Sequence, residues 1–260
     1  MSTKQIQGKL WSIAPNYWST LFEPFFIPMY KKALEQVYLD ESSLLLDAGC
    51  GAGLFCRMAV STGAQVMGVD AATGLLEIAR KRNPNIGFLE EDLESLPFAA
   101  GNFDVVTGFN SFQYAGNFSN ALSEARRVAK DGGRIVLGIW DKPELSEATN
   151  VLKAIGTLLP PPPPGTPGPF ALSEEGKIES LAEATGLRVI YKTSAACPFL
   201  YYSLEDAVKS FMGTGPAAAA MNYVNESAVK QTISAAMQDY HLTEDMYHLQ
   251  NSFLLFVIEK

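Results

Sequence analysis

The 260-residue sequence has few of the residues that build metal centres and disulfide frameworks. It contains three cysteines and two histidines, and His241 and His248 lie far along the chain from every cysteine. A structural zinc site needs about four cysteine or histidine ligands brought together, and a disulfide framework needs paired cysteines at regular spacings. We therefore expect no bound metal, and cysteines that stay reduced as they do in the cytoplasm.

The sequence is also poor in positive charge and in long apolar runs. Its 20 lysines and arginines are outnumbered by 28 acids, which gives a net charge of −8 and a pI near 4.9. Because binding to a phosphate backbone requires a basic surface, we expect no nucleic-acid partner. No apolar run reaches the roughly 18 residues of a membrane span, and residues 1–9 lack the pattern of a signal peptide. We expect no membrane span and a cytoplasmic location.

Strands and helices alternate between residues 43 and 140. Apolar runs typical of buried strands fall at 44–47, 65–70, 86–90, 103–109 and 134–140. Amphipathic helical patterns separate most of them, at 53–62, 74–82 and 118–129, the last expected to stop at Asp131-Gly132-Gly133. Two further strands, at 187–197 and 251–259, would complete seven. The pattern predicts an α/β fold with a doubly wound, mostly parallel sheet.

Three regions interrupt this alternation. Residues 9–40 are rich in aromatics and broken by prolines, which predicts a helical flap with one longer helix at 29–38. Residues 141–172 predict a helix at 144–159 and a stiff proline-rich loop at 160–169. Residues 198–245 predict inserted helices, and Ser173 is expected to cap a helix that ends at Gly186. We expect one domain, 1–260, in which these regions cover a ligand-binding core at 43–140.

Polar residues follow the ends of the predicted strands. Strand 44–47 leads into Asp47-Ala-Gly-Cys-Gly-Ala-Gly53, and strand 65–70 ends in Asp70. Asp92 and Leu93 follow the third strand, and Phe109 and Asn110 follow the fourth. Ligands of open α/β sheets bind beyond these carboxyl ends, so the sequence predicts a nucleotide-type site there. Taken singly, each feature also has a structural explanation: the glycines as a tight turn, Asp70 as a cap, and Asp92 as a surface acid.

These ordered motifs resemble those of the class I S-adenosylmethionine-dependent methyltransferases. The similarity spans about residues 44–140 and adds Phe103-Asp-Val-Val and Asp131-Gly-Gly-Arg to the motifs above. It is greatest for the small-molecule branch of the ubiquinone and menaquinone biosynthesis type (methyltransferase type 11). The resemblance implies a Rossmann-like sheet with an antiparallel last strand. It also implies S-adenosyl-L-methionine as cofactor, S-adenosyl-L-homocysteine as product, and a small-molecule methyl acceptor.

The resemblance assigns roles to particular residues. Asp70 would hold the ribose, Asp92 the adenine amine, and the Gly49–Gly51 backbone the methionine moiety. Asp47 would orient the methionine amino group, directly or through water. The remaining residues expected at the cofactor are Tyr17, Cys50, Ala71, Leu93, Phe109 and Asn110. Those expected near the acceptor are Gln113, Tyr114, Tyr201 and Tyr202.

The catalytic group and the acceptor stay open at this point. His241 and His248 are the available bases at neutral pH, needed only if the acceptor must lose a proton. Aromatic residues in the interrupting regions indicate an apolar or aromatic acceptor, with the O-, C- or N-atom undecided, as is the choice between monomer and homodimer. The alternatives are an NAD(P)-dependent oxidoreductase, disfavoured by the position of the third glycine, and a non-catalytic S-adenosylmethionine-binding protein.

Overall fold

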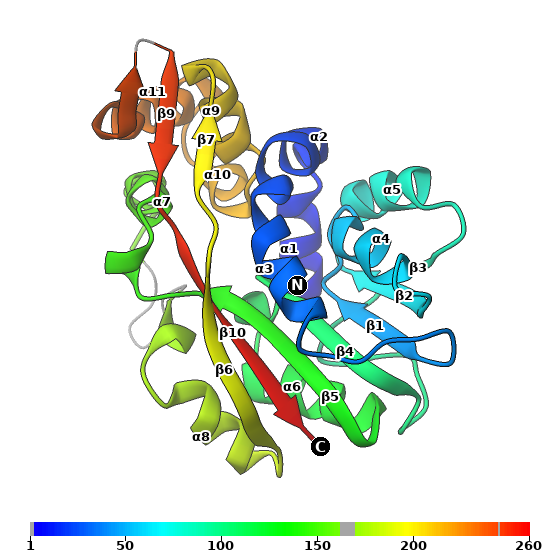
Figure 1. Ribbon diagram of the computed structural model, residues 1–260. Coiled ribbons are helices and arrows are strands. Elements are labelled where there is room, and N and C mark those ends of the chain that lie inside the picture. Colours follow the sequence, from blue (N-terminus) through cyan, green and yellow to red (C-terminus); the bar gives the residue numbers. More distant parts are fainter. Residues whose placement is uncertain (1–2, 162–169, 244) are drawn as a thin grey trace.

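The structure is a computed structural model that describes residues 3–161, 170–243 and 245–260. A seven-stranded sheet in the order β3-β2-β1-β4-β5-β10-β6 forms its centre (Figure 1). Only β10 runs antiparallel to its neighbours, β5 and β6. The predicted α/β class and the antiparallel last strand are confirmed. The strands are β1 (Leu44–Ala48), β2 (Gln65–Asp70), β3 (Gly87–Glu90), β4 (Phe103–Phe109), β5 (Ala129–Trp140), β6 (Arg188–Ala196) and β10 (Ser252–Glu259).

Helices cover both faces of this sheet because successive side chains of a strand point to opposite faces. On β1, Leu45 packs into the cluster shared with α3 (Ile27–Leu34) and α4 (Leu54–Val60). Its neighbour Leu46 packs with α6 (Phe118–Val128) and α8 (Lys177–Ala184). The helix that links β2 to β3 is α5 (Thr73–Arg82). Every strand end on one edge of the sheet is thereby held between two helical layers.

The expectation that Asp131-Gly132-Gly133 stops a helix was wrong. Helix α6 already ends at Val128, and these residues lie inside β5. There the pairing of β5 with β4 shifts register between Phe103 and Val105. The amide of Gly132 donates to the carbonyl of Lys260, and the Lys260 amide donates to Gly133. Gly132 and Gly133 thus lie at a β-bulge whose backbone hydrogen-bonds with Lys260.

The cap assigned to Ser173 was also wrong. Ser173 lies in a 3-10 turn, η5 (Ala171–Ser173), and its hydroxyl donates to the carbonyl of Trp140. Helix α8 begins at Lys177 instead and ends before Gly186, as expected. The predicted helix at 144–159 is divided into a 3-10 turn, η4 (Pro143–Leu145), and α7 (Ala148–Gly156). Most of the predicted proline-rich loop, at 162–169, lies outside the described residues.

The N-terminal region holds one helix that sequence patterns missed. Helix α1 (Thr3–Trp11) has only one buried residue, Gly8, so it carries no apolar stripe to reveal it. It is followed by α2 (Pro15–Tyr17), η1 (Trp18–Phe22), η2 (Glu23–Phe26) and α3. The helix expected at 29–38 is therefore α3, which begins and ends earlier. Residues Phe22 and Phe26 are almost completely buried and fix this region to the core.

The C-terminal third contains the predicted inserted helices and a small sheet that was not predicted. The helices are α9 (Leu204–Met212), α10 (Gly215–Ala220) and α11 (Glu226–Met237). The sheet has the order β7-β9-β8, from β7 (Phe199–Tyr201), β9 (Met246–Leu249) and β8 (His241–Thr243), the last following the 3-10 turn η6 (Gln238–Tyr240). Strands this short carry too little alternation to be recognised. The division into flap, core and insertions stays a prediction.

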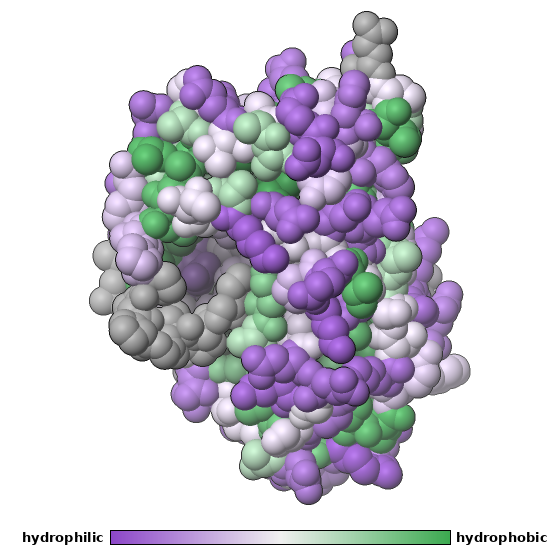
Figure 2. All heavy atoms as spheres, turned by 90° about the vertical axis from the view of Figure 1, so that its left-hand side faces the viewer, coloured by the Kyte–Doolittle hydropathy of each residue, from purple (hydrophilic) through white to green (hydrophobic). Residues whose placement is uncertain are grey.

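The surface carries no sign of a bilayer-crossing segment within the described ranges. None of the helices there is long and apolar enough to span a membrane. On the face shown in Figure 2, hydrophilic side chains predominate and hydrophobic ones form separate small groups. That face offers no single broad apolar patch for a permanent partner.

Candidate functional site

A cavity lies beyond the carboxyl ends of β1, β2 and β4, with about 690 Å³ of empty space when the solvent at its mouth is included. This is where ligands of open α/β sheets bind. The strand ends contribute polar and glycine residues to its wall. Those expected from the sequence are Gly49, Gly51, Asp70, Ala71, Asp92, Leu93, Phe109, Asn110 and Tyr114.

The glycine turn after β1 forms the floor of the cavity. Gly49 and Gly51 have φ angles of +86° and +53°, in the left-handed region that favours glycine. A methyl group at position 49 would lie 2.1 Å from the Cβ of Ser111, whereas one at position 51 would lie 3.4 Å from Trp18 Nε1. Gly49 is therefore required by packing within the fold. At position 51 a methyl group would fit, but it would contact the indole of Trp18.

Asp70 locks this turn to the end of β2. Its Oδ2 accepts from the amide of Gly51 at 2.8 Å, and its Oδ1 accepts from the amide of Ala72 at 2.8 Å. Burial raises the pKa of the Asp70 carboxyl, while these backbone hydrogen bonds oppose the rise. A carboxylate has about four lone-pair sites, so Asp70 keeps acceptor capacity toward the cavity. Asp70 does not cap α5, whose N-cap is Ala72 without a side-chain hydrogen bond, and it lies on the cavity wall.

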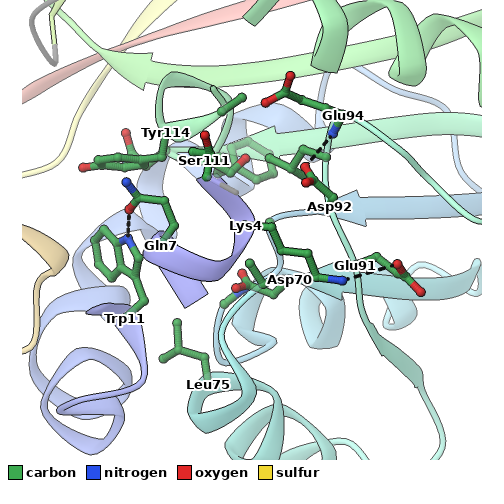
Figure 3. Close-up of a pocket in the computed structure, with 18 of the residues that line it drawn as sticks. Lys4, Gln7, Trp11, Asp70, Leu75, Glu91, Asp92, Glu94, Ser111 and Tyr114 are labelled. Carbon is green, nitrogen blue, oxygen red and sulfur yellow. Dashed lines mark hydrogen bonds and ion pairs between the residues drawn. The ribbon is translucent and has the colours of Figure 1, made fainter. Parts of the chain in front are cut away.

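Asp92 lies on the same wall, after β3. Its Oδ1 accepts from the amide of Glu94 at 3.0 Å, which fixes the loop that carries it. Figure 3 shows Asp92 and Glu91 across the cavity from Gln7 and Trp11. Asp92 therefore lies at one end of the cavity, and Asp70 lies nearer its middle.

Asp47 and Cys50 do not reach the cavity wall, although both belong to the turn. Asp47 is 2% exposed, and it accepts hydrogen bonds from Thr107 Oγ1 at 2.8 Å and from Cys56 Sγ at 3.4 Å. Burial raises the pKa of Asp47 to about 7 and that of Cys50 to about 11. Asp47 therefore supports the turn from below, and the Cys50 thiol stays protonated at neutral pH.

Asn110 holds the most constrained backbone on the wall. Among the described residues it is the one non-glycine residue with positive φ, at +49°. Its amide donates to Gly138, and its Oδ1 accepts from Gln113 Nε2 at 3.2 Å. Within the described chain, its buried Nδ2 and the buried Gln113 Oε1 have no hydrogen-bond partner. Strained residues with unpaired polar atoms are typical of functional sites.

The N-terminal region supplies the opposite wall, in part through residues that precede the predicted flap of 9–40. Thr3, Lys4, Gln7 and Trp11 of α1 line the cavity, together with Trp18. Helix α1 approaches closely because Gly8 lies against the carbonyl of Ala71, where a Cβ would come within 2.3 Å. The aromatic side chain that faces the glycine turn is Trp18. Its neighbour Tyr17, the expected one, is half-buried and lies off the wall.

A smaller cavity adjoins the first. It shares Trp18, Asn110 and Tyr114 with the larger one and is a narrow space with room for about one water molecule. The rest of its wall comes from the flap, from β5 and from both insertions: Phe22, Phe26, Trp140, Leu152, Thr214 and Pro216. The insertions therefore meet the strand ends at the shared residues.

Other residues expected near the acceptor or as bases lie elsewhere. Tyr201 is buried and donates to Ser210 Oγ, whereas Tyr202 is exposed. His241 and His248 lie on β8 and β9 of the small sheet and line neither cavity. Among the residues described, no group of three or more potential ligands is arranged to hold a metal ion.

The fold and the place of the strand-end cavity are those of the Rossmann-like α/β class of proteins, and comparisons with known proteins make this more specific. Residues 46–137 match the family model described as "Methyltransferase domain". The chain is 31% identical, over 71% of its length and 66% of the relative's, to a malonyl-[acyl-carrier protein] O-methyltransferase of Erwinia pyrifoliae. It is 32% identical to a demethylmenaquinone methyltransferase of Renibacterium salmoninarum, over 38% of this chain and 42% of that one. Residues 46–137 are therefore similar to methyltransferase domains, and both curated relatives are named methyltransferases.

The same comparisons limit which properties of the relatives can be assigned to this chain. The chain covers less than two thirds of the length of these curated relatives. Among solved structures, the [4+2]-cyclase SpnF matches with a TM-score of 0.62 over 97% of this chain and 96% of that chain, at 19% identity. That likeness concerns the fold alone. A protein named a cyclase thus has the same fold, so the reaction must be argued from the site.

The cavity residues fit S-adenosylmethionine. Within the described residues the indole N–H of Trp18 is buried without a hydrogen-bond partner, and a Cβ added at Gly51 would lie 3.4 Å from its nitrogen, in ordinary contact. A buried unpaired donor is costly unless a ligand satisfies it, and a carboxylate would. Asp70 and Asp92 offer acceptors for hydroxyl and amine groups along the same cavity. Donors and acceptors therefore occur in the order that an amino acid, a ribose and an adenine require.

Proposed function

We propose that this protein transfers a methyl group from S-adenosylmethionine to a small, apolar or aromatic acceptor, with S-adenosylhomocysteine as product. One observation carries the proposal: the Gly49–Gly51 turn, Asp70 and Asp92 meet in a single cavity whose far wall presents the unpaired indole N–H of Trp18. The mainly buried free cysteines are consistent with action in the cytoplasm.

The residues divide the work of holding the cofactor. Trp18 donates to the methionine carboxylate, Asp70 accepts from the ribose hydroxyls and Asp92 accepts from the adenine amine. The Leu93 backbone lies beside the adenine ring, and Phe109 and Ala71 pack against apolar parts. Asp47 acts from beneath the turn, by fixing β1 to β4 through Thr107. The bound cofactor supplies an electrophilic methyl group on a sulfonium, and the protein contributes chiefly by positioning the acceptor in line with it.

Binding of the cofactor is tested by calorimetry with S-adenosylmethionine and S-adenosylhomocysteine. Asp70→Asn removes a charged acceptor, and we expect it to weaken both by about ten- to a hundredfold. Asp104→Asn is the matched control. Asp104 lies at the start of β4, at the sheet edge opposite the cavity, and forms an ion pair with Lys130. If Asp70→Asn binds as tightly as Asp104→Asn, the assignment of this cavity is wrong.

Two alternatives are separated by further measurements. Stabilisation by NAD or NADP, without stabilisation by S-adenosylmethionine, in a thermal-shift comparison would indicate an oxidoreductase. Methyl transfer to any member of a metabolite panel would exclude a non-catalytic binding protein. The shared fold of the cyclase makes this turnover assay necessary.

A further inference from the structure

Arg82 lies where the floor of the larger cavity meets its N-terminal wall. Its guanidinium donates from Nη2 to the carbonyl of Ser19 at 2.6 Å, and from Nη1 to Glu23 Oε2 at 2.7 Å and to the carbonyl of Ala52 at 3.4 Å. Ser19 and Glu23 belong to the N-terminal region, whereas Ala52 belongs to the glycine turn after β1. One side chain of α5 therefore joins the wall to the floor.

The segment that Arg82 holds carries Trp18, which lines the cavity. Ser19 follows Trp18 in η1, a π-helical turn, and such turns are rare and frequent at functional sites. A Cβ added at Gly51 would lie 3.4 Å from Trp18 Nε1 and 3.6 Å from Glu23 Oε1. The N-terminal region thus brings an indole N–H and a carboxylate against the same glycine, beside the point where Arg82 joins them to the turn.

A guanidinium fixes direction as well as distance. Its N–H donors form a rigid planar fork, so partners bound to different nitrogens are held at a defined angle. Arg82 uses both terminal nitrogens for the N-terminal region, Nη2 for Ser19 and Nη1 for Glu23. The side chain of Glu23 is 3% exposed and that of Arg82 26%, so water competes little for these hydrogen bonds.

Helix α9 holds the same turn from the other side. Ser210 Oγ donates to the carbonyl of Leu21 at 2.9 Å, and a Cβ added at Gly213 would lie 2.5 Å from the amide nitrogen of Trp18. Without Arg82, η1 would therefore stay attached to the insertion but lose its attachment to the glycine turn. The expected consequence is a displaced Trp18 in a protein that is still folded.

We propose that Arg82 is a positioning residue for the cofactor, which it does not touch: it holds Trp18 against the Gly51 turn. Among the described residues, Arg82 lines neither cavity. The inference rests on the methyl-transfer function proposed above, in which Trp18 binds the methionine carboxylate. The alternative is that the ion pair with Glu23 serves stability alone, so that cofactor affinity follows the stability of each variant.

A double variant of the full chain separates these two roles. Arg82→Met leaves the Glu23 carboxylate buried without its counter-ion, and should lower both the melting temperature and the affinity for S-adenosylhomocysteine. Combining it with Glu23→Met removes both charges, and apolar replacement of a buried ion pair often restores stability. We expect the double variant to melt at a higher temperature than Arg82→Met, yet to bind S-adenosylhomocysteine about tenfold or more weakly than the wild-type chain.

Two further variants support the comparison. Arg80→Met is the matched control, because Arg80 lies on the same helix and donates to the carbonyl of Phe88 at 3.0 Å, on β3; it should leave the affinity unchanged. Arg82→Lys keeps a positive charge beside Glu23, so that folding is preserved, but it lacks the fork that binds several partners at once. It should also bind S-adenosylhomocysteine more weakly than Arg80→Met does.

Calorimetry measures affinity at a temperature at which every variant is folded, and hydrogen exchange of the unliganded chains measures the attachment of η1. The amides of residues 18–22 should exchange about tenfold faster or more in Arg82→Lys and the double variant than in Arg80→Met. A wild-type chain that binds no S-adenosylhomocysteine contradicts the proposed function, and this inference with it. If the wild-type chain binds, this inference alone is overturned when the Arg82 variants match Arg80→Met in affinity or in exchange.

Discussion

Arg82 donates a 2.7 Å hydrogen bond from Nη1 to Oε2 of Glu23, a residue 59 positions earlier in the chain. Arg82 ends α5 and also donates to the carbonyl of Ser19, while Glu23 accepts from the amide of Leu54 at the start of α4. One ion pair thus joins the N-terminal flap to two helices beside the cavity. Burial raises the pKa of Glu23 to about 7, although the charge of Arg82 opposes the rise.

Replacement of Arg82 by methionine should destabilise the fold in a pH-dependent way. Without the guanidinium, an ionised Glu23 would be buried without a counter-ion, which costs about 3 kcal/mol or more. At pH 6 Glu23 avoids this cost by taking a proton, so the loss should be smaller there than at pH 8. Urea denaturation at both values measures the difference. Lys81→Met, at an exposed neighbour on α5, is the control, and equal losses at both pH values would contradict the account.

Asp47 should make the protein less stable as pH rises toward 7. Its pKa is about 3.8 in an unfolded chain and about 7 when buried, so between these values the folded state binds a proton that the unfolded state has lost. The stabilisation is complete below pH 4 and disappears as pH rises through 7. Glu23 contributes in the same sense between its ordinary 4.5 and about 7.

Asp47→Asn removes the part of that dependence that Asp47 contributes. The decline in the free energy of unfolding between pH 5 and pH 8 should shrink by on the order of 2 kcal/mol. Asp40→Asn is the control, since hydrogen bonds from Ser42 and Ser43 lower the pKa of Asp40 and keep it ionised over this range. A decline as steep in Asp47→Asn as in Asp40→Asn would show that Asp47 is ionised in the folded protein.

The two glycines of the turn should respond differently to alanine. Gly49→Ala places a methyl group 2.1 Å from Ser111 Cβ, and we expect a loss of about 3 kcal/mol or more from the clash and the positive φ. Gly51→Ala meets nothing closer than 3.4 Å, so its cost should stay near 1 kcal/mol. Its methyl group nevertheless occupies the space below Trp18. Calorimetry should therefore find a folded Gly51→Ala protein that binds S-adenosylhomocysteine at least about tenfold more weakly.

Trp18→Phe should weaken cofactor binding with little loss of stability, whereas Gly49→Ala should mainly lower stability. The change removes a buried donor that is unsatisfied in the described structure, which offsets part of the packing lost with the larger ring. We expect the melting temperature without cofactor to change by only a few degrees, while affinity for S-adenosylmethionine falls about tenfold. Trp140→Phe, in the smaller cavity, should leave that affinity unchanged. Equal affinities for the two variants would remove Trp18 from the cofactor site.

Much of the sheet was predictable because its central strands β1, β4 and β10 are buried on both faces and its helices are amphipathic. The bounds of 65–70 and 103–109 agree with β2 and β4 at both ends. The strand-end residues were predictable for the same reason, since parallel strands deliver their carboxyl ends to one edge. What escaped prediction depends on contacts distant in sequence. Helix α1 has a polar sequence, and its place on the cavity wall depends on Gly8 meeting Ala71.

The spacing of residues along the sequence also failed to predict which way individual side chains point. Asp47 is the last residue but one of β1 and accepts from Thr107 on the neighbouring strand β4, whereas Asp70 ends β2 and lines the cavity. Likewise Tyr17 and Trp18 are adjacent, and the short helical turn at Trp18 decides which of them faces Gly51.

The pairing of β7 with β9 sets Tyr201 opposite Tyr247, so helices α9–α11 leave and rejoin the body at neighbouring points. When the two ends of a segment lie close together, a segment of different length can replace it while the strands at both ends stay in place. Thr214 and Pro216 reach the smaller cavity from this segment, whereas Asp70 and Asp92 belong to the sheet. Gly213 of this segment lies against the backbone of Trp18 and Gly215 against the indole of Trp11, so a transplanted segment must keep both glycines for the wall of the larger cavity to stay in place.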